Sequence, residues 1–282
     1  MKNVGVIGGG TMGAGIAEVV AKAGVPVRVL ERAEAVEAAQ ERIATSLARG
    51  VKAGKLSEED SAATLARVTV TTDIESFADA DLVIEAMPEI EELKVEYFTK
   101  LDSIVRPDAI LATNTSSIPV IRLANATEHP ERVLGMHFFN PVPVMTLVEI
   151  VTTLRVDRAV VDTVTEFARE GLGKKTIESK DQAGFIVNAL LVPYLTSAMR
   201  MYETGFASAE DIDEGMRHGC GHPMGPLRLS DTVGLDVMLS VAESLYAEFN
   251  EPHYAPPVIL RRMVDAGYLG RKSGRGFYDY SK

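Results

Sequence analysis

Two charged or ionisable residues stand in runs that are otherwise apolar, where an unpaired polar group is costly to bury. His137 lies in the nearly apolar run 135–141, and Glu149 occupies the centre of the apolar run 147–151. A pair between His137 and Glu149 would satisfy both side chains and would hold an imidazole that can exchange protons near neutral pH. A satisfied core histidine is the structural alternative. The pattern indicates proton-transfer chemistry.

Ser116 and Asn188 are two further candidates for the same site. Ser116 belongs to Asn-Thr-Ser-Ser at 114–117, which follows an apolar strand, so it would emerge at the carboxyl end of a sheet, where open α/β folds bind ligands. Asn188 stands in the uncharged stretch 182–199. Serine and asparagine also cap helices and satisfy backbone groups, so each residue alone has a structural explanation. The coincidence of all four candidates in one chain favours function.

A glycine-rich turn directly after the first apolar run predicts a dinucleotide site. The motif Gly-x-Gly-x-x-Gly begins at Gly8, and the intervening Thr11 and Met12 open the following helix. Gly8 permits the tight turn, Gly10 lets the backbone approach a pyrophosphate, and Gly13 lets helix and strand pack closely. The phosphates would lie at the helix N-terminus, where unpaired N–H groups favour negative charge. Alone this motif is weak, because glycine-rich turns also occur for structural reasons.

An acidic residue strengthens the dinucleotide prediction. Glu31 ends the second apolar run, roughly 20 residues past the glycines, where the ribose 2′-hydroxyl of NAD is recognised. A solvated residue at a helix start is the structural alternative. The neighbouring Arg32 keeps NADP open as a second cofactor, since a guanidinium binds phosphate well.

The elements that position these residues alternate between strand and helix in the first half of the chain. This order is typical of a parallel, doubly wound α/β sheet, whose buried strands are continuous apolar runs. We expect strands at 4–7, 27–30, 68–70, 82–84 and 110–112, helices at 12–23 and 33–49, and further strands at 133–139, 147–151 and 176–177 around a helix at 157–169.

From Gly184 onward the chain is predicted to be helical. We place the domain boundary near Ala183, giving a Rossmann-type dinucleotide domain at 1–183 and an all-helical domain at 184–282. The uncharged stretch 182–199 approaches the length of a bilayer span, but polar residues and Pro193 interrupt it, so a buried helix is favoured. Further helices are expected at 207–218, 235–249 and 258–266.

Composition excludes several classes of partner. The 282 residues carry a net charge of −11, so no global positive field exists to attract nucleic acid or an anionic membrane, and a polyanionic ligand needs a local basic patch. The single cysteine, Cys220, excludes an intramolecular disulfide, and no targeting segment precedes the first strand. A cytoplasmic protein is expected.

Together these features resemble the family of L-3-hydroxyacyl-CoA dehydrogenases, and especially its short-chain bacterial members, the 3-hydroxybutyryl-CoA dehydrogenases. The resemblance covers essentially the whole chain. The motifs that carry it are Gly-x-Gly-x-x-Gly at 8–13, Asn-Thr-Ser-Ser at 114–117, His-Phe-Phe-Asn-Pro-Val-Pro-Val-Met at 137–145, Gly-Phe-Ile-Val-Asn at 184–188, His-Pro-Met-Gly-Pro at 222–226 and Gly-Arg-Lys-Ser-Gly-Arg-Gly-Phe-Tyr at 270–278.

The resemblance implies a role for each candidate. His137 takes the proton from a 3-hydroxyl while hydride leaves C3 for the nicotinamide, and Glu149 orients and stabilises the imidazole. Ser116 and Asn188 hydrogen-bond substrate oxygens. The cofactor is NAD, the substrate is an acyl-CoA, and family members generally pair through the helical domain, which implies a homodimer.

The resemblance also implies contacts outside this centre. Asn114, Glu89 and Lys94 are placed beside the cofactor, although the acidic cluster after Pro88 is less typical of the family. The CoA phosphates are expected to meet a basic patch at the end of the long N-terminal helix and in the turn after it, whose alternative is an ordinary solvated helix end. This patch consists of Arg49, Lys52 and Lys55.

Other functions stay open on a similar scaffold, because fold alone does not fix the substrate. A 3-hydroxy sugar acid would need no basic patch, and a hydroxyacyl group on a carrier protein would lack the adenosine phosphates. A nucleotide-binding structural or redox-sensing protein is the non-enzyme alternative, but it would have no reason to keep all four polar candidates together.

Overall fold

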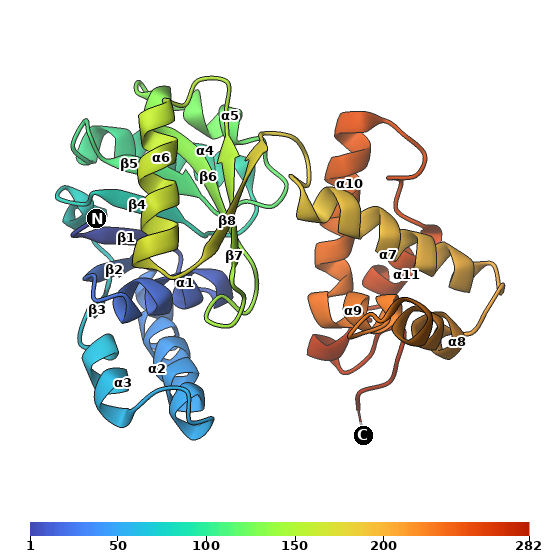
Figure 1. The fold of residues 1–282 in the computed structure, drawn as a ribbon. Coiled ribbons are helices and arrows are strands. Elements are labelled where there is room, and N and C mark those ends of the chain that lie inside the picture. The colour runs from blue at the N-terminus through green and yellow to red at the C-terminus, as the bar shows by residue number, and fades with distance from the viewer. Residues whose placement is uncertain (282) are drawn as a thin grey trace. The chain divides into compact units, whose positions relative to one another are not determined.

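The protein consists of two compact units, which divide between Asp181 and Gln182 (Figure 1). The structure is a computed structural model, and it describes residues 1–281. Each unit has its own hydrophobic core, and the division lies close to Ala183, where the sequence places the boundary.

The first unit is built on one eight-stranded sheet with the order β3-β2-β1-β4-β5-β6-β7-β8. The chain runs from β1 outward to β3 and then returns to the other side of β1. The connections that leave β1 and β4 therefore lead in opposite directions along the sheet. Open α/β sheets bind ligands at such a switch point, outside the carboxyl ends of the strands. The strands are β1 (Val4–Ile7), β2 (Val27–Leu30), β3 (Val68–Thr71), β4 (Leu82–Glu85), β5 (Ile110–Thr113), β6 (Val133–Phe138), β7 (Leu147–Thr152) and β8 (Lys175–Lys180).

Strands β1 to β6 are parallel, but β7 runs antiparallel to β6. The connection is residues 139–146, which is too short for the crossover that a parallel pair needs. Strand β8 is again parallel to β7, because α6 (Arg158–Glu166) and a π-helical turn (Phe167–Gly171) supply the crossover. This hairpin sets the residues of β6 directly opposite those of β7.

Helices cover both faces of the sheet, as in a doubly wound fold, and this confirms the predicted fold class (Figure 1). One face packs Val6, Ile84 and Ile150 against α1, α2 and α6. The other packs Ile7 and Leu111 against α4 and α5. The helices are α1 (Thr11–Lys22), α2 (Val36–Lys52), α3 (Glu58–Leu65), α4 (Glu91–Ile104) and α5 (Val120–Ala124), with single 3₁₀ turns at Ala33–Ala35, Ile74–Phe77 and Pro130–Arg132.

The second unit is helical, as predicted. Its first helix begins at Val187 and not at Gly184, because Gly184 and Phe185 both have positive φ, +75° and +49°, which a right-handed helix excludes. Within residues 1–281, no helix combines the length and apolarity needed to cross a membrane. The helices are α7 (Val187–Glu203), α8 (Ala209–Glu214), α9 (Pro226–Val233), α10 (Leu235–Phe249) and α11 (Val258–Asp265), with a π-helical turn at Gly215–Gly219 and a 3₁₀ turn at Arg271–Ser273.

Two buried aspartates bind the backbone directly after the motif 222–226 and within the motif 270–278. Asp213 caps α9 by accepting hydrogen bonds from the backbone N–H groups of Leu227 and Arg228. Asp231 accepts the backbone N–H groups of Phe277 and Tyr278. Both carboxylates are 1% exposed. These motifs therefore fold the second unit around buried charge.

Candidate active site

The glycine-rich turn between β1 and α1 has the geometry of a dinucleotide-binding loop. Gly8 adopts φ +92°. A Cβ at Gly13 would lie 1.8 Å from the carbonyl oxygen of Gly8, so only glycine allows the helix to start so close to the strand. A Cβ at Gly10 would meet no atom within 4 Å, which leaves open space at the N-terminus of α1 beside Thr11 and Met12. A pyrophosphate group fits there.

The carboxylate of Glu31 is fixed against this turn. Its Oε2 accepts the backbone N–H of Gly9 at 2.8 Å, and its Oε1 accepts the backbone N–H of Arg32 at 2.9 Å. The Arg32 side chain is 77% exposed, and it pairs with Glu34 at 3.3 Å and with Glu31 at 3.9 Å. The acid is therefore oriented at the predicted ribose position, while the neighbouring guanidinium extends to the surface.

His137 lies between Glu149 and Ser116. The antiparallel register of β6 and β7 sets His137 directly opposite Glu149, and the histidine Nδ1 lies 2.7 Å from the Glu149 Oε2. On the other side of the ring, Nε2 lies 3.1 Å from the Ser116 Oγ. His137 is 4% exposed and Glu149 is 0% exposed. Because a carboxylate only accepts hydrogen bonds, the hydrogen bond between these two side chains is one that Nδ1–H donates.

Asn114 joins the ends of two neighbouring strands. Its side-chain Oδ1 accepts the backbone N–H of Phe138 at 2.8 Å, and its own backbone N–H donates to the carbonyl of Glu85. Asn114 is 9% exposed. The sequence predicts it as a cofactor contact, and the structure gives it the additional task of tying the turn that carries Ser116 to the strand that carries His137.

A buried network of ion pairs supports the turn that carries Ser116. Lys94 is 1% exposed, and its ammonium pairs with Glu85 at 2.9 Å and with Glu89 at 2.8 Å. Glu85, which is fully buried at the end of β4, also accepts the hydroxyl of Thr113 at 2.7 Å. Sequence reasoning missed Glu85. The signal was nevertheless present, because Glu85 follows an apolar run just as Glu149 interrupts one.

Glu89 binds the residues around Ser116 directly. Its Oε1 accepts hydrogen bonds from the Thr115 hydroxyl and from the backbone N–H groups of Ser116 and Ser117 at 2.8 and 3.1 Å. Burial on its own would raise the pKa of the Glu89 carboxyl, but the charge of Lys94 and these hydrogen bonds outweigh it and lower the pKa below its ordinary value. Glu89 and Lys94, which the sequence places beside the cofactor, thus also hold the serine turn.

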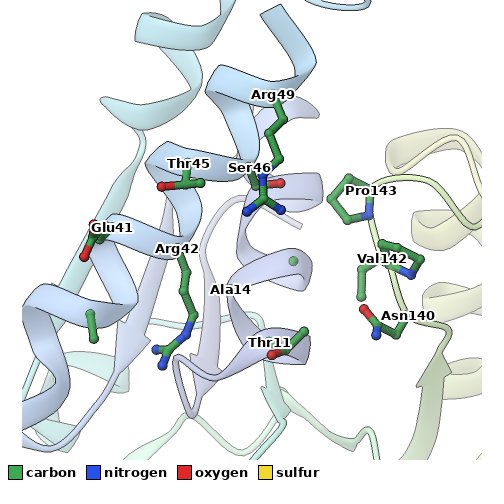
Figure 2. Close-up of a pocket in the computed structure, with 13 residues that line it drawn as sticks. Thr11, Ala14, Glu41, Arg42, Thr45, Ser46, Arg49, Asn140, Val142 and Pro143 are labelled. Carbon is green, nitrogen blue, oxygen red and sulfur yellow. The ribbon is translucent and has the colours of Figure 1, made fainter. Parts of the chain in front are cut away.

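A groove of about 500 Å³ adjoins the start of α1 (Figure 2). Arg42 and Arg49 from α2 lie on one side of it, and Val142 and Pro143 from the loop 139–146 lie on the other. Arg42, which the sequence analysis did not single out, also donates to the carbonyl of Gly9 at 3.1 Å. Glu41 also lines the groove, so its lining includes two basic residues and one acidic residue.

The predicted basic patch divides at this groove. Arg49 lines it, whereas Lys52 and Lys55 are exposed at the end of α2 and in the following turn and are not among its lining residues. Asn188 is partly exposed in the first turn of α7, in the second unit.

Comparison with known proteins places the chain in a family. Residues 3–182 match the NAD-binding domain of 3-hydroxyacyl-CoA dehydrogenase, and residues 184–280 match the C-terminal domain of the same enzyme. A 3-hydroxybutyryl-CoA dehydrogenase of Mycobacterium tuberculosis is 55% identical, over 99% of this chain and 99% of its own.

Solved structures agree with these matches. The crystal structure of M. tuberculosis FadB2 superposes with a TM-score of 0.98 at 55% identity, and each chain is covered to 99%. The (S)-3-hydroxybutyryl-CoA dehydrogenase PaaH1 of Ralstonia eutropha superposes with a TM-score of 0.94 at 46% identity over 100% of both chains. The chain therefore belongs to the 3-hydroxyacyl-CoA dehydrogenase family of oxidoreductases, with NAD as its cofactor.

Proposed function

We propose that the protein interconverts (S)-3-hydroxybutyryl-CoA and acetoacetyl-CoA, with His137 as the general base in oxidation and the general acid in reduction. The observation that carries this proposal is the imidazole held between the Glu149 carboxylate and the Ser116 hydroxyl. The names of the relatives from M. tuberculosis and R. eutropha support the four-carbon substrate.

The proton chemistry follows from the state of the imidazole. With Nδ1–H donated to Glu149, the Nε2 lone pair can accept the proton of the 3-hydroxyl. The imidazolium that forms lies against the buried carboxylate, which stabilises its charge. The acceptor for the hydride from C3 would be supplied by NAD when it is bound. In the reverse direction the imidazolium of His137 returns its proton to the 3-oxo oxygen.

Ser116 and Asn188 have positioning roles in this proposal. The Ser116 hydroxyl donates to the substrate 3-oxygen beside Nε2, and its place is set by Glu89 and Asn114. Asn188 hydrogen-bonds a substrate oxygen from α7. Hydrogen bonds of this kind stabilise charge that develops on oxygen during the reaction.

The groove beside α2 is proposed to hold the phosphates of CoA. Arg42 and Arg49 are among its lining residues, and guanidiniums bind phosphate in bidentate fashion. Arg49, Lys52 and Lys55 together form the proposed substrate patch, and Arg42 joins it. A further part of the proposal is a cytoplasmic homodimer that forms through the second unit, supported by the single cysteine and by exposed apolar residues on α7.

A substrate series tests the proposal. Oxidation of NADH would be followed with 3-oxoacyl-CoA esters of increasing length, with an acetoacetyl group on a carrier protein, and with a 3-oxo sugar acid. We expect the highest kcat/KM with acetoacetyl-CoA. Faster turnover of the carrier-protein ester or of the sugar acid would replace the proposed substrate.

Paired variants test the phosphate site. Alanine at Arg42 and Arg49 should raise the KM for acetoacetyl-CoA without a comparable loss of kcat, because these charges contact a part of the substrate that does not react. Alanine at Lys52 and Lys55 tests the other part of the proposed patch, since these two lysines are not among the lining residues of the groove. A larger increase in KM for the Lys52 and Lys55 pair would indicate that the CoA phosphates bind at the end of α2 and not in the groove.

A further inference from the structure

Lys174 makes an unusual contact with the loop that separates His137 from Glu149. It follows Gly173 and directly precedes β8, and its side chain is half-buried. The ammonium donates to the carbonyl of Val142 at 2.7 Å and to the carbonyl of Met145 at 2.7 Å. Hydrogen bonds from a charged donor are stronger than neutral ones, so one side chain crosslinks the two halves of the loop 139–146.

The rest of the loop is held by backbone hydrogen bonds. The backbone N–H groups of Val144 and Met145 both donate to the carbonyl of Pro141. At the far end of the loop, the backbone N–H of Lys175 donates to the backbone carbonyl of Thr146. These contacts are local turns and the edge of the sheet ladder. The charged side chain of Lys174 joins Val142 and Met145 of the loop to the residue that directly precedes β8.

The held loop forms one wall of the groove. Val142 is 2% exposed and packs on α1 at Gly15, where a Cβ would lie only 2.9 Å from the Val142 Cβ. With Pro143, Val142 faces Arg42 and Arg49 across the groove (Figure 2). The separation of wall and guanidiniums is therefore set by where the loop rests on α1.

Burial and two charged residues of α1 act on the Lys174 ammonium in opposite directions. Burial and the charge of Lys22 lower its pKa, and the buried Glu18 opposes this effect. Lys22 is itself paired with Glu18 on α1. A methionine in place of Lys174 would fill similar space without donating, and would leave two carbonyls without their ionic donor.

We propose that Lys174 is a positioning residue that fixes the groove wall and thereby sets affinity for the phosphorylated part of the substrate. This inference rests on the proposed function of the groove. The proton-transfer pair should be spared, because four facing residue pairs hold β6 to β7 independently of the loop. Loss of Lys174 would then change KM and leave kcat nearly unaltered.

Hydrogen exchange tests the crosslink without reference to activity. In Lys174→Met, the amides of Val144 and Met145 should exchange at least about tenfold faster than in the wild type, because local opening becomes easier. Lys175→Met is the matched control, since the adjacent lysine side chain is exposed. Lys174→Arg, which keeps the charge and the donors, should restore much of the protection. Unchanged exchange in Lys174→Met would overturn the inference. If Lys174→Met does not fold, Lys174→Gln is measured in its place.

Kinetics test the consequence for the substrate. Lys174→Met should raise the KM for acetoacetyl-CoA about tenfold with kcat within about twofold, and should leave the KM for acetoacetyl-pantetheine, which lacks the adenosine phosphates, unchanged. Equal increases for both substrates would show that the loop does not form the phosphate wall. A wild-type protein that does not reduce acetoacetyl-CoA would defeat the proposed function, whereas the exchange experiment would still decide whether the crosslink exists.

Discussion

Single residues in this protein owe their chemistry to their immediate partners. His137 has a polar neighbour at each ring nitrogen: Nδ1 lies 2.7 Å from the Glu149 carboxylate, and Nε2 lies 3.1 Å from the Ser116 hydroxyl. Glu149 is tolerated at 0% exposure because it has that ring as a partner. The cost of burying either side chain alone explains why the sequence signal was strong at both positions.

The first residue-scale prediction concerns His137. In His137→Gln, kcat should fall by about 10²-fold or more, the scale of a lost general acid or base, while folding and NADH binding persist. Steady-state kinetics and NADH fluorescence measure the two effects. Glu149→Gln should do less harm, because glutamine still accepts the Nδ1 hydrogen bond and loses only the charge. Near-normal turnover in folded His137→Gln would remove the histidine from its proposed role.

The second concerns cofactor choice at Glu31. The carboxylate is held by the turn and would face the 2′-phosphate of NADP as a like charge, whereas Arg32 is 77% exposed and already meets Glu34. We expect kcat/KM to favour NADH over NADPH by at least about tenfold, or roughly 1.4 kcal/mol. Equal efficiency with NADPH would give Arg32 the deciding role.

At the scale of elements, strand ends determine the site. The sequence placed the strands well, because buried parallel strands are continuous apolar runs bounded by glycine and polar residues. It also located Ser116 and His137, since both follow or lie within such runs. Glu85 ends the run of β4 but was not recognised, because its partner Lys94 lies on the next helix and the pairing is a tertiary contact.

Charged side chains on helices and in loops were harder to interpret. Arg42 lies on a helix rich in charge, where most such residues are solvated, and only the fold brings it to the glycine turn. Lys174 and Lys175 are adjacent lysines. They differ because the side chain of Lys174 donates to carbonyls of the loop 139–146. Sequence periodicity carries no information about such contacts.

Glu89 provides the prediction at this scale. Because its folded pKa lies below the ordinary value of 4.5, its stabilising contribution is fully present above that pH and is lost as the pH falls through the folded pKa. Glu89→Gln should therefore lower the Tm at pH 7 by about 3 °C or more, since 1 kcal/mol shifts Tm by roughly 2–4 °C at this size. The gap to wild type should shrink as the pH falls below 4.5.

Thermal unfolding across this pH range measures the gap. Glu92→Gln is the control, because Glu92 is exposed in the first turn of α4. A gap for Glu89→Gln that stays constant from pH 7 to pH 4 would mean that its charge does not hold the serine turn.

For the whole molecule, the candidate residues are unevenly divided. The glycine turn, the histidine pair, the ion network and the groove all belong to the first unit, and Asn188 is the candidate from the second. In the second unit, Asp213 and Asp231 form hydrogen bonds with backbone groups in or next to its sequence motifs. We propose that this unit also pairs with a second copy of the chain, in addition to the substrate contact proposed for Asn188.

The prediction at this scale is a homodimer through α7. Leu190 on α7 is 73% exposed and Phe206 just after it is 78% exposed, more than a helix needs if it only packs within its own subunit. A stable interface buries roughly 800 Å² per partner, for which such residues supply the apolar centre. Sedimentation at micromolar concentration should give twice the chain mass of 30.4 kDa. Leu190→Glu should shift the protein toward monomer, because it places a charge in that centre, whereas Leu154→Glu, at a residue 98% exposed in the first unit, should not. A wild-type monomer would count decisively against pairing through this helix.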